Sequence, residues 1–194
     1  MKSLYLDASI QKLTTEIPAD SSASYESTSE FGLLRFAHQF ESETEVAGPM
    51  ALQCFMSTDA GFDLDLFVGI RKIDANGEEV RFWNRLSSED IVSHGWLRAS
   101  RRPEPARIGD PLVPIFDADT ESQVIPGEVM ELNVEILPSG TVFEAGSTLV
   151  LELRGRDITE LANFQHHHVF NAGNHTVWCG SRFPSRLLVP MAPK

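Results

Sequence analysis

Apolar and polar residues alternate along most of the chain, in short runs rich in β-branched and aromatic side chains. This period of two is typical of strands that bury one face, whereas an amphipathic helix has a period near 3.6. We therefore predict many strands and few helices. The predicted strands cover residues 4–6, 33–40, 46–57, 62–73, 79–83, 128–137, 149–154, 176–179 and 186–189.

Segments rich in glycine, proline, serine and asparagine separate these runs and predict turns and loops. The sequence Asp-Ala-Asn-Gly at residues 74–77 is the clearest turn, because Asn-Gly accepts the positive φ angles of a tight hairpin. Residues 18–30 are serine-rich and predict a loop, and residues 138–146 predict a turn. Pro49 indicates a strand edge or start, and Pro190 and Pro193 are expected to end the last strand.

Residues 100–126 differ from the rest because prolines interrupt any regular element. So long an irregular connection in a compact domain generally has a binding or contact role. Many short strands with long connections predict an all-β fold, a two-layer β-sandwich with long irregular loops and Greek-key or jelly-roll winding. We expect one domain over residues 1–194, with a first strand and serine-rich loop in residues 1–30 and a proline-rich crossover in residues 100–126.

The net charge of −12 and the pI near 4.8 argue against nucleic acid as a partner, because phosphate binding depends on lysine and arginine. No apolar run reaches the roughly 18 residues of a membrane span, and the first residues do not resemble a signal peptide. Cys54 and Cys179 are too few for a disulfide framework and too far apart for a typical zinc motif. These features predict a cytoplasmic protein with free thiols and no membrane partner.

The motifs of common enzyme classes are missing from the sequence. The closest two of the thirteen glycines are Gly140 and Gly146. This spacing excludes a G-x-S-x-G nucleophile elbow, a G-x-G dinucleotide motif and a P-loop. Since the H-E-x-x-H zinc motif is absent too, we predict no catalytic residue and no cofactor.

Two groups of polar side chains could nevertheless hold a metal ion. His166 and His168 would share one face of a strand and are the candidate ligands, but no carboxylate follows in residues 169–174 and His175 is the last histidine. Asp63 and Asp65 would also share a strand face, but the order of a calcium loop is absent. We predict no metal, a loop or edge run of histidines, and a solvated or hydrogen-bonded aspartate pair.

Several short phrases occur in the order found in one family. They lie at residues 46–49 (VAGP), 63–68 (DLDLFV), 73–77 (IDANG), 95–100 (GWLRAS), 126–128 (PGE), 137–146 (LPSGTVFEAG), 171–173 (NAG) and 187–190 (LLVP). On these phrases the chain resembles the C-terminal, non-catalytic domain of X-Pro dipeptidyl-peptidases and CocE/NonD (cocaine esterase-like) serine hydrolases. The resemblance covers nearly the whole chain.

The resemblance implies a galactose-binding-like jelly roll that packs against an α/β-hydrolase catalytic domain, in the same polypeptide or missing from the sequence given. The catalytic serine, aspartate and histidine would lie in that partner domain, so no catalytic position transfers here. The function implied is accessory: covering or shaping the active site of an ester, amide or acyl-peptide hydrolase, and supporting assembly.

The face expected to contact that domain contains Trp96, Arg98, Arg101 and Leu112. Gly95 is expected to allow a turn before Trp96, which is either a core residue or an interface residue, and Arg98 can bind a carboxylate bidentately. With the partner absent, an apolar face of this kind would favour a homo-oligomer.

Two other functions are considered beside the accessory one. The first is a free-standing carbohydrate-binding module of galactose-binding-like fold, because a fold does not determine a function. Such modules expose aromatic side chains, whereas Trp83, Trp96 and Trp178 fall within apolar strand patterns, which argues against it. The second is a metal-dependent enzyme that uses the histidine run.

Overall fold

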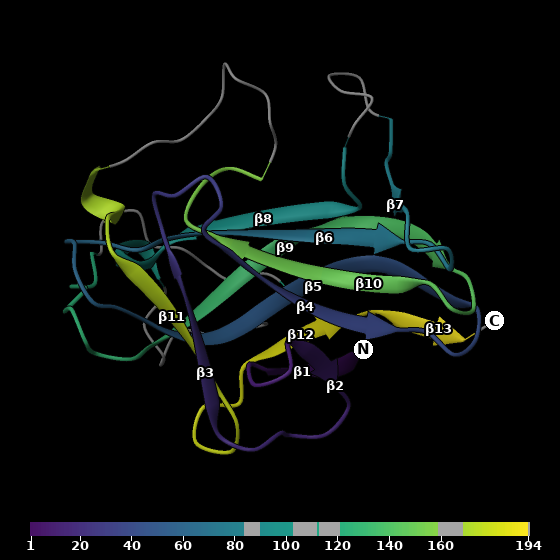
Figure 1. Ribbon diagram of the computed structural model, residues 1–194, viewed down its shortest axis with the longest axis horizontal. Helices are drawn as coiled ribbons and strands as arrows, with labels where there is room; N and C mark the ends of the chain where they lie inside the picture. Colours follow the sequence, from purple (N-terminus) through teal and green to yellow (C-terminus); the bar gives the residue numbers. More distant parts are fainter. Residues whose placement is uncertain (84–89, 103–111, 113–120, 159–168, 194) are drawn as a thin grey trace.

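Strands make up nearly all of the regular structure. The computed structural model describes residues 1–83, 90–102, 112, 121–158 and 169–193 (Figure 1). The strands are β1 (Lys2–Asp7), β2 (Lys12–Thr14), β3 (Ser21–Glu26), β4 (Leu33–Gln39), β5 (Thr44–Thr58), β6 (Asp65–Ile73), β7 (Glu79–Val80), β8 (Ser93–Arg98), β9 (Met130–Phe143), β10 (Thr148–Arg154), β11 (Asn174–Cys179), β12 (Arg186–Val189) and β13 (Met191–Pro193). Two short 3-10 turns are η1 (Ala99–Arg101) and η4 (Val169–Asn171). Over these ranges, no helix has the length and apolar character needed to cross a membrane.

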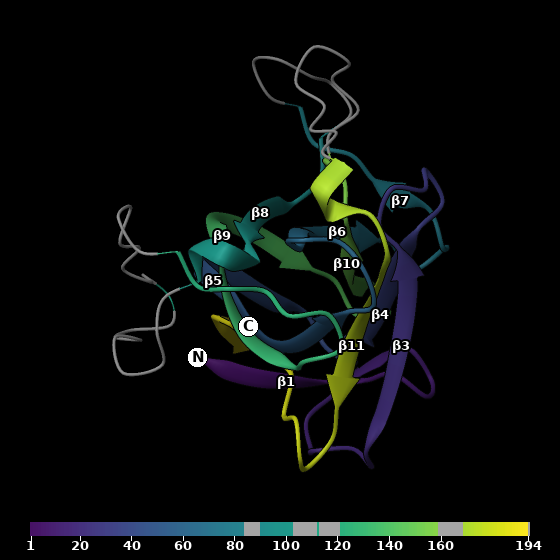
Figure 2. The same cartoon turned by 90° about the vertical axis from the view of Figure 1, so that its left-hand side faces the viewer.

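The strands form two layers (Figures 1 and 2). In one layer, β10 lies between β4 and β6, and both β7 and β8 pair with β6. The long strand β5 organises the other layer: β9 pairs along one of its edges, and β11, β12 and β13 pair along the other. Strand β3 extends this layer beyond β11, β1 joins β12 to β2, and β2 bridges to β4. The predicted all-β sandwich is confirmed, while jelly-roll winding stays a prediction.

The core lies between the layers and follows directly from the alternation of the sequence. Leu66, Val68 and Ile70 of β6 are fully buried, and Leu151 and Leu153 lie beside them on β10. Burying a side chain of this size stabilises the fold by about 1.5–3 kcal/mol. One continuous cluster contains buried residues from β1 to β12.

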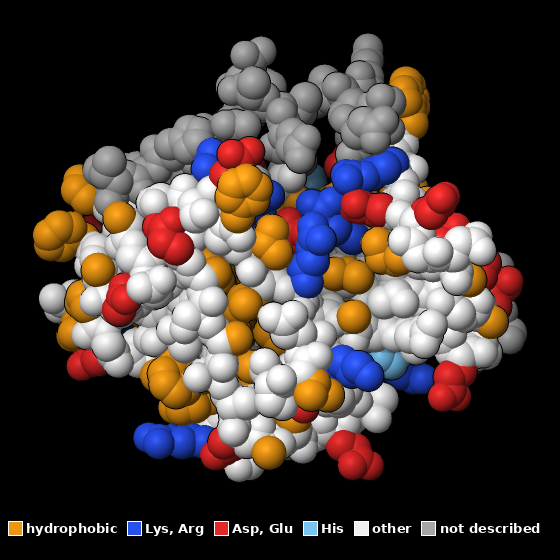
Figure 3. Space-filling view, viewed as in Figure 1, with side chains coloured by type: hydrophobic (Ala, Val, Ile, Leu, Met, Phe, Trp, Pro, Cys, Tyr) orange, Lys and Arg blue, Asp and Glu red, His pale blue; other side chains and the backbone are white. Residues whose placement is uncertain are grey.

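The outer face of the β4, β10 and β6 layer carries paired charges. Glu152 is fully buried there and accepts hydrogen bonds from Arg71 and Arg35. Burial raises the pKa of Glu152, but the hydrogen bonds and charges of Arg71 and then Arg35 outweigh it and hold the pKa below its usual range. Figure 3 shows basic side chains grouped with acidic ones on the side of the molecule that Figure 1 presents. A small apolar cluster on the layer's outer face consists of Phe67, Ile91 and Ile158.

Two of the predicted irregular segments are strands. The loop predicted over residues 18–30 is wrong, because Ser21–Glu26 forms β3 and pairs with β11 along its whole length. Most side chains of β3 are polar and only Tyr25 is buried, so its composition resembles that of a loop. The chain also continues as β13 after Pro190, and pairs there with the start of β5.

The β5–β9 ribbon explains two further differences from the prediction. Its register shifts between Gly48 and Met50, where Gly48 has a φ of 126°. Pro49 therefore lies at an irregularity inside β5, a position that tolerates a missing N–H. Strand β9 continues to Phe143, so the turn predicted over residues 138–146 is confined to its last part.

The predicted turn at residues 74–77 is present, with a different internal geometry. The Gly77 N–H donates to the Asp74 carbonyl, and Gly77 is the only residue of the turn with a positive φ, 89°. The Asp74 carboxylate accepts hydrogen bonds from the N–H groups of Asn76 and Glu78. An aspartate side chain therefore stabilises the turn. The returning strand, β7, is shorter than the predicted residues 79–83.

Strand β8 approaches β9 very closely at Gly95. A Cβ atom on Gly95 would lie 2.0 Å from the carbonyl oxygen of Glu135. Nearby, the Ser93 hydroxyl donates to the Leu137 carbonyl and holds the two strands together. The expected turn before Trp96 is therefore wrong: Gly95 lies within a strand, and its role is to let two backbones pack against each other.

Replacing Gly95 with alanine should destabilise the domain by about 3 kcal/mol, because the new Cβ atom overlaps a backbone oxygen. The measurement is urea unfolding followed by tryptophan fluorescence. Gly140→Ala is the matched control, because it also lies in a strand and its Cβ would meet nothing within 4 Å. Equal unfolding midpoints for the two variants would contradict the close approach of β8 and β9.

Candidate docking face and pocket

The outward side chains of β8 form an exposed aromatic surface. Alternate residues of β8 are buried, and His94, Trp96 and Arg98 lie on the opposite face. Trp96 is 60% exposed, and its ring stacks on His94 with the centroids 5.7 Å apart and the planes at 19°. Trp96 is therefore not a core residue, which leaves the interface interpretation.

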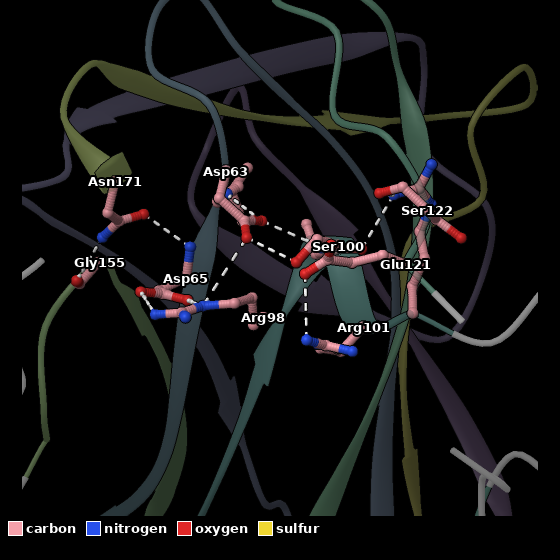
Figure 4. Close-up of polar contacts among 12 residues, drawn as sticks. Asp63, Asp65, Arg98, Ser100, Arg101, Glu121, Ser122, Gly155 and Asn171 are labelled. Carbon is pink, nitrogen blue, oxygen red and sulfur yellow. Dashed lines mark hydrogen bonds and ion pairs between the residues drawn. The ribbon is translucent and has the colours of Figure 1, made fainter. Parts of the chain in front are cut away.

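A partly buried ion pair lies at the end of this face. Nε and Nη2 of Arg98 donate to the two carboxylate oxygens of Asp65, at 2.7 and 2.9 Å (Figure 4). The two residues are also register partners between β6 and β8. Asp65 is 5% exposed, so its charge depends on this bidentate contact. The contact that the sequence predicts for Arg98 is thus present.

The second aspartate joins β6 to the turn η1. The Asp63 carboxylate accepts hydrogen bonds from the N–H of Leu64, at 2.8 Å, and from the N–H and hydroxyl of Ser100, at 3.0 and 2.6 Å. Nε of Arg98 lies 3.7 Å from Asp63 Oδ2. Of the two alternatives predicted for Asp63 and Asp65, solvated or hydrogen-bonded, the structure shows the second, with donors from other residues.

Asn171 attaches the turn η4 to the same corner of the sandwich. Its side-chain oxygen accepts the N–H of Asp65 at 2.6 Å, and its side-chain nitrogen donates to the Gly155 carbonyl at 2.7 Å (Figure 4). Its own carbonyl accepts a hydrogen bond from the Ser27 hydroxyl. Asn171 is 3% exposed, so these contacts replace water and connect segments far apart in the sequence.

A pocket of about 300 Å³ opens beside these hydrogen bonds. The rings of Phe62 and Phe170 meet edge to face with centroids 6.1 Å apart, and the residues are 82% and 51% exposed. On the other side, Arg101 Nη2 and Glu121 Oε1 form an exposed ion pair at 3.0 Å. The described residues that line the pocket are Phe62, Asp63, Asp65, Arg98, Arg101, Glu121, Phe170 and Asn171.

The structure brings together three of the four residues predicted for the interface. Trp96 and Arg98 share a face of β8, and Arg101 follows in η1. Leu112 is half-buried, and the residues on both sides of it lie outside the described part of the chain. The metal candidates His166 and His168 also lie outside it. Assignment of the four residues to an interface stays a prediction.

Sequence reasoning missed half of the pocket lining. Phe62 falls at the start of a predicted strand, which suggests burial, and Phe170 follows the histidine run. Glu121 lies in the proline-rich crossover, where no periodicity indicates a direction. One feature of the sequence pointed to Asn171: it begins the NAG phrase at residues 171–173, which is part of the family resemblance.

His175 is a buried residue of β11. Its Nδ1 lies 3.3 Å from the Tyr25 hydroxyl oxygen, and the two rings pack edge to face. Burial lowers the pKa of His175 to about 4, because the protonated form would lose its water shell. Within the described ranges, no three histidine, cysteine, aspartate or glutamate side chains are grouped to hold a metal ion.

The sequence predicted that the tryptophans are not exposed, which argued against a carbohydrate-binding module, and this prediction is wrong for two of them. Trp83 and Trp96 are 79% and 60% exposed. Trp178 is half-buried, and its indole N–H donates to the Ser57 hydroxyl. Apolar neighbours in the sequence therefore did not predict burial of the first two.

The chain is thus an all-β sandwich whose sequence contains none of the common catalytic motifs. One of its faces carries exposed aromatic and charged side chains. Residues 5–188 match the family model described as the X-Pro dipeptidyl-peptidase C-terminal non-catalytic domain. The chain belongs to this family, as its sequence phrases predicted.

Solved structures agree with this assignment. Two crystal structures of a CocE/NonD family hydrolase from Staphylococcus aureus match with 30% identity and TM-scores of 0.91 and 0.90. An aminopeptidase from the marine sediment archaeon Thaumarchaeota archaeon and an α-amino acid ester hydrolase share the fold, with TM-scores of 0.69 and 0.67 at 15% and 13% identity. Each match covers 98% of this chain and 36% of the solved chain, so the chain spans about a third of these proteins. A comparison with curated proteins found no match.

The buried His175 should make the stability of the domain depend on pH. Because its pKa is lowered from 6.5 to about 4, the unfolded chain binds the proton more readily than the folded one. Stability should therefore be complete above about pH 6.5 and fall by about 3 kcal/mol as the pH drops to 4. Urea unfolding between pH 7 and 4 measures this loss. In the His175→Phe variant, the loss of stability between pH 7 and 4 should be smaller by about 3 kcal/mol. If the variant and the original protein lose the same stability over this range, His175 is not the group responsible.

Proposed function

We propose that this domain docks on an α/β-hydrolase catalytic domain of the same family and covers or shapes its active site. The observation that carries the proposal is the continuous exposed face formed by Trp96, Arg98 and the pocket. The parent enzyme would hydrolyse esters, amides or acyl-peptides, and the serine nucleophile would come from the catalytic domain. The 36% coverage of the solved hydrolases supports this division of labour.

The exposed apolar surface of this face supports the proposed contact. Contacts between domains of one chain commonly bury about 600–1,500 Å², and exposed aromatic side chains are a preferred component of such contacts. Trp96 and Phe62 expose most of their surface, whereas the large side chains of the core are buried. Their exposure contributes nothing to the stability of the isolated sandwich, which supports a role in binding a partner.

The proposal includes one domain over residues 1–194 and a cytoplasmic location. The single large core cluster supports the first, because it contains residues from nearly every strand. The free, buried thiols of Cys54 and Cys179 support a reducing compartment. The proposed activity assigns no cofactor to this domain.

Carbohydrate binding is the second candidate, and the exposure of Trp83 and Trp96 favours it. Aromatic rings on a β-sandwich can stack on sugar rings. Titration with galactose and with longer oligosaccharides, followed by tryptophan fluorescence, separates the two functions. The accessory role predicts no saturable change in fluorescence.

A chimera tests the docking role. The region of the Staphylococcus aureus hydrolase that matches this chain is replaced by residues 1–194, and hydrolysis of p-nitrophenyl esters is measured with thermal unfolding. We expect an active chimera in which Trp96→Glu lowers both activity and melting temperature, because a buried unpaired charge would weaken the domain contact. Residues 1–194 alone should show no turnover.

Ile17→Glu is the matched control for this chimera. Ile17 is 50% exposed and lies in the connection between β2 and β3, which is on the opposite side of the molecule from β8 (Figures 1 and 2). If Trp96→Glu and Ile17→Glu leave the chimera equally active and equally stable, β8 does not face the catalytic domain.

The isolated domain should self-associate weakly through the same face, because its exposed aromatic side chains have no catalytic domain to contact. Sedimentation velocity over a range of protein concentrations measures the association. Trp96→Glu and Leu112→Glu should weaken it, whereas Ile17→Glu should not. Self-association that persists in both of the first two variants would contradict this use of the face.

A further inference from the structure

The mouth of the pocket is built from two exposed aromatic rings on a rigid support. The Phe170 carbonyl accepts hydrogen bonds from the N–H groups of Phe62 and Asp63, at 3.1 and 3.2 Å. Gly61 has a φ of 81°, and a Cβ atom on it would lie 2.7 Å from the same carbonyl oxygen. The rings are therefore presented on backbone that is already ordered, so binding would require little further ordering.

The described lining of the pocket has more carboxylates than guanidinium groups. Asp65 pairs with Arg98, and Glu121 pairs with Arg101. Asp63 is the third carboxylate, and it is held by neutral donors and lies 3.7 Å from the guanidinium nitrogen of Arg98. The neighbouring Arg102 donates to backbone carbonyl groups and is not part of the lining. The described lining thus carries one net negative charge.

Aromatic faces next to a carboxylate form a favourable site for a planar cation. A guanidinium group stacks on aromatic rings, donates to carboxylates in the plane of the group, and is more weakly hydrated than an ammonium group. The volume of about 300 Å³ is sufficient for one long side chain. The net charge of −12 of this chain also favours a basic partner surface.

We infer that the pocket binds an arginine side chain, which the catalytic domain supplies when the two domains dock. The partner in this inference rests on the proposed function. The arginine would stack on the exposed ring of Phe62, next to its edge-to-face contact with Phe170, with its guanidinium toward Asp63. In this arrangement the pocket determines how the two domains are oriented, while Trp96 contributes apolar contact area.

The isolated domain can be tested with N-acetyl-L-arginine amide, whose backbone carries no charge. Its binding is followed by NMR through the amide signals of Asp63, Ser100 and Asn171. We expect saturable shifts with a dissociation constant in the millimolar range. The citrulline analogue has nearly the same shape without the charge and should bind at least about tenfold more weakly.

Variants of the pocket locate the binding. Phe62→Ala should weaken arginine binding about threefold to tenfold, and Asp63→Asn should weaken it and reduce its dependence on salt. Phe31→Ala is the matched control, because Phe31 is 86% exposed but does not line the pocket. Equal binding of the citrulline analogue, or arginine binding that Phe62→Ala leaves unchanged, would overturn the inference.

The two proposals can fail separately. A chimera that is active and sensitive to Trp96→Glu, combined with no arginine binding to the pocket, would refute the arginine site and leave the docking role intact. Arginine binding that depends on Phe62, combined with a chimera insensitive to Trp96→Glu, would refute docking through β8 and leave the chemistry of the pocket intact.

Discussion

A buried carboxylate, Asp65, constrains the end of the sandwich that contains the proposed docking face. A charge that is 5% exposed requires a partner, and the register of β6 and β8 places Arg98 directly opposite it. The Asp65 N–H is held by Asn171, whose side chain also reaches Gly155. One residue therefore connects β6, β8, η4 and the end of β10, and the neighbouring pocket is a consequence of this arrangement.

The two sides of β8 differ in their surroundings: the inner side is packed and the outer side is exposed. Gly95 lets β8 press against β9, so the inner side of β8 is closely packed. Its outer side presents Trp96 on His94, and the pocket beyond it presents Phe62 and Phe170. A domain built in this way buries its own core and leaves these aromatic side chains exposed. This combination suits a non-catalytic domain of a larger enzyme.

The family match and the structure answer different questions about this domain. The match over residues 5–188 identifies a non-catalytic domain, and in the Staphylococcus aureus hydrolase the matching region makes up 36% of the chain. Neither comparison indicates which surface meets the rest of the enzyme. The proposed docking face is instead based on the exposure of Trp96 and Phe62 and on the charges of the pocket.

The sequence alone determined the fold class, most of the strands and the absence of known catalytic motifs, because these depend on local periodicity and on residue spacing. It also indicated the carboxylate contact of Arg98 and the family. It could not identify β3, whose polar side chains pair with β11, or the role of Gly95, which depends on a carbonyl oxygen 40 residues away along the chain. The pocket was decided only by the tertiary structure, since its lining comes from segments around residues 62, 98, 121 and 170. Exposure of Trp96 likewise depends on which face of β8 the opposite layer covers, and a period of two is the same for both faces. Phe62 precedes β6 and lies outside the strand in which its sequence pattern placed it.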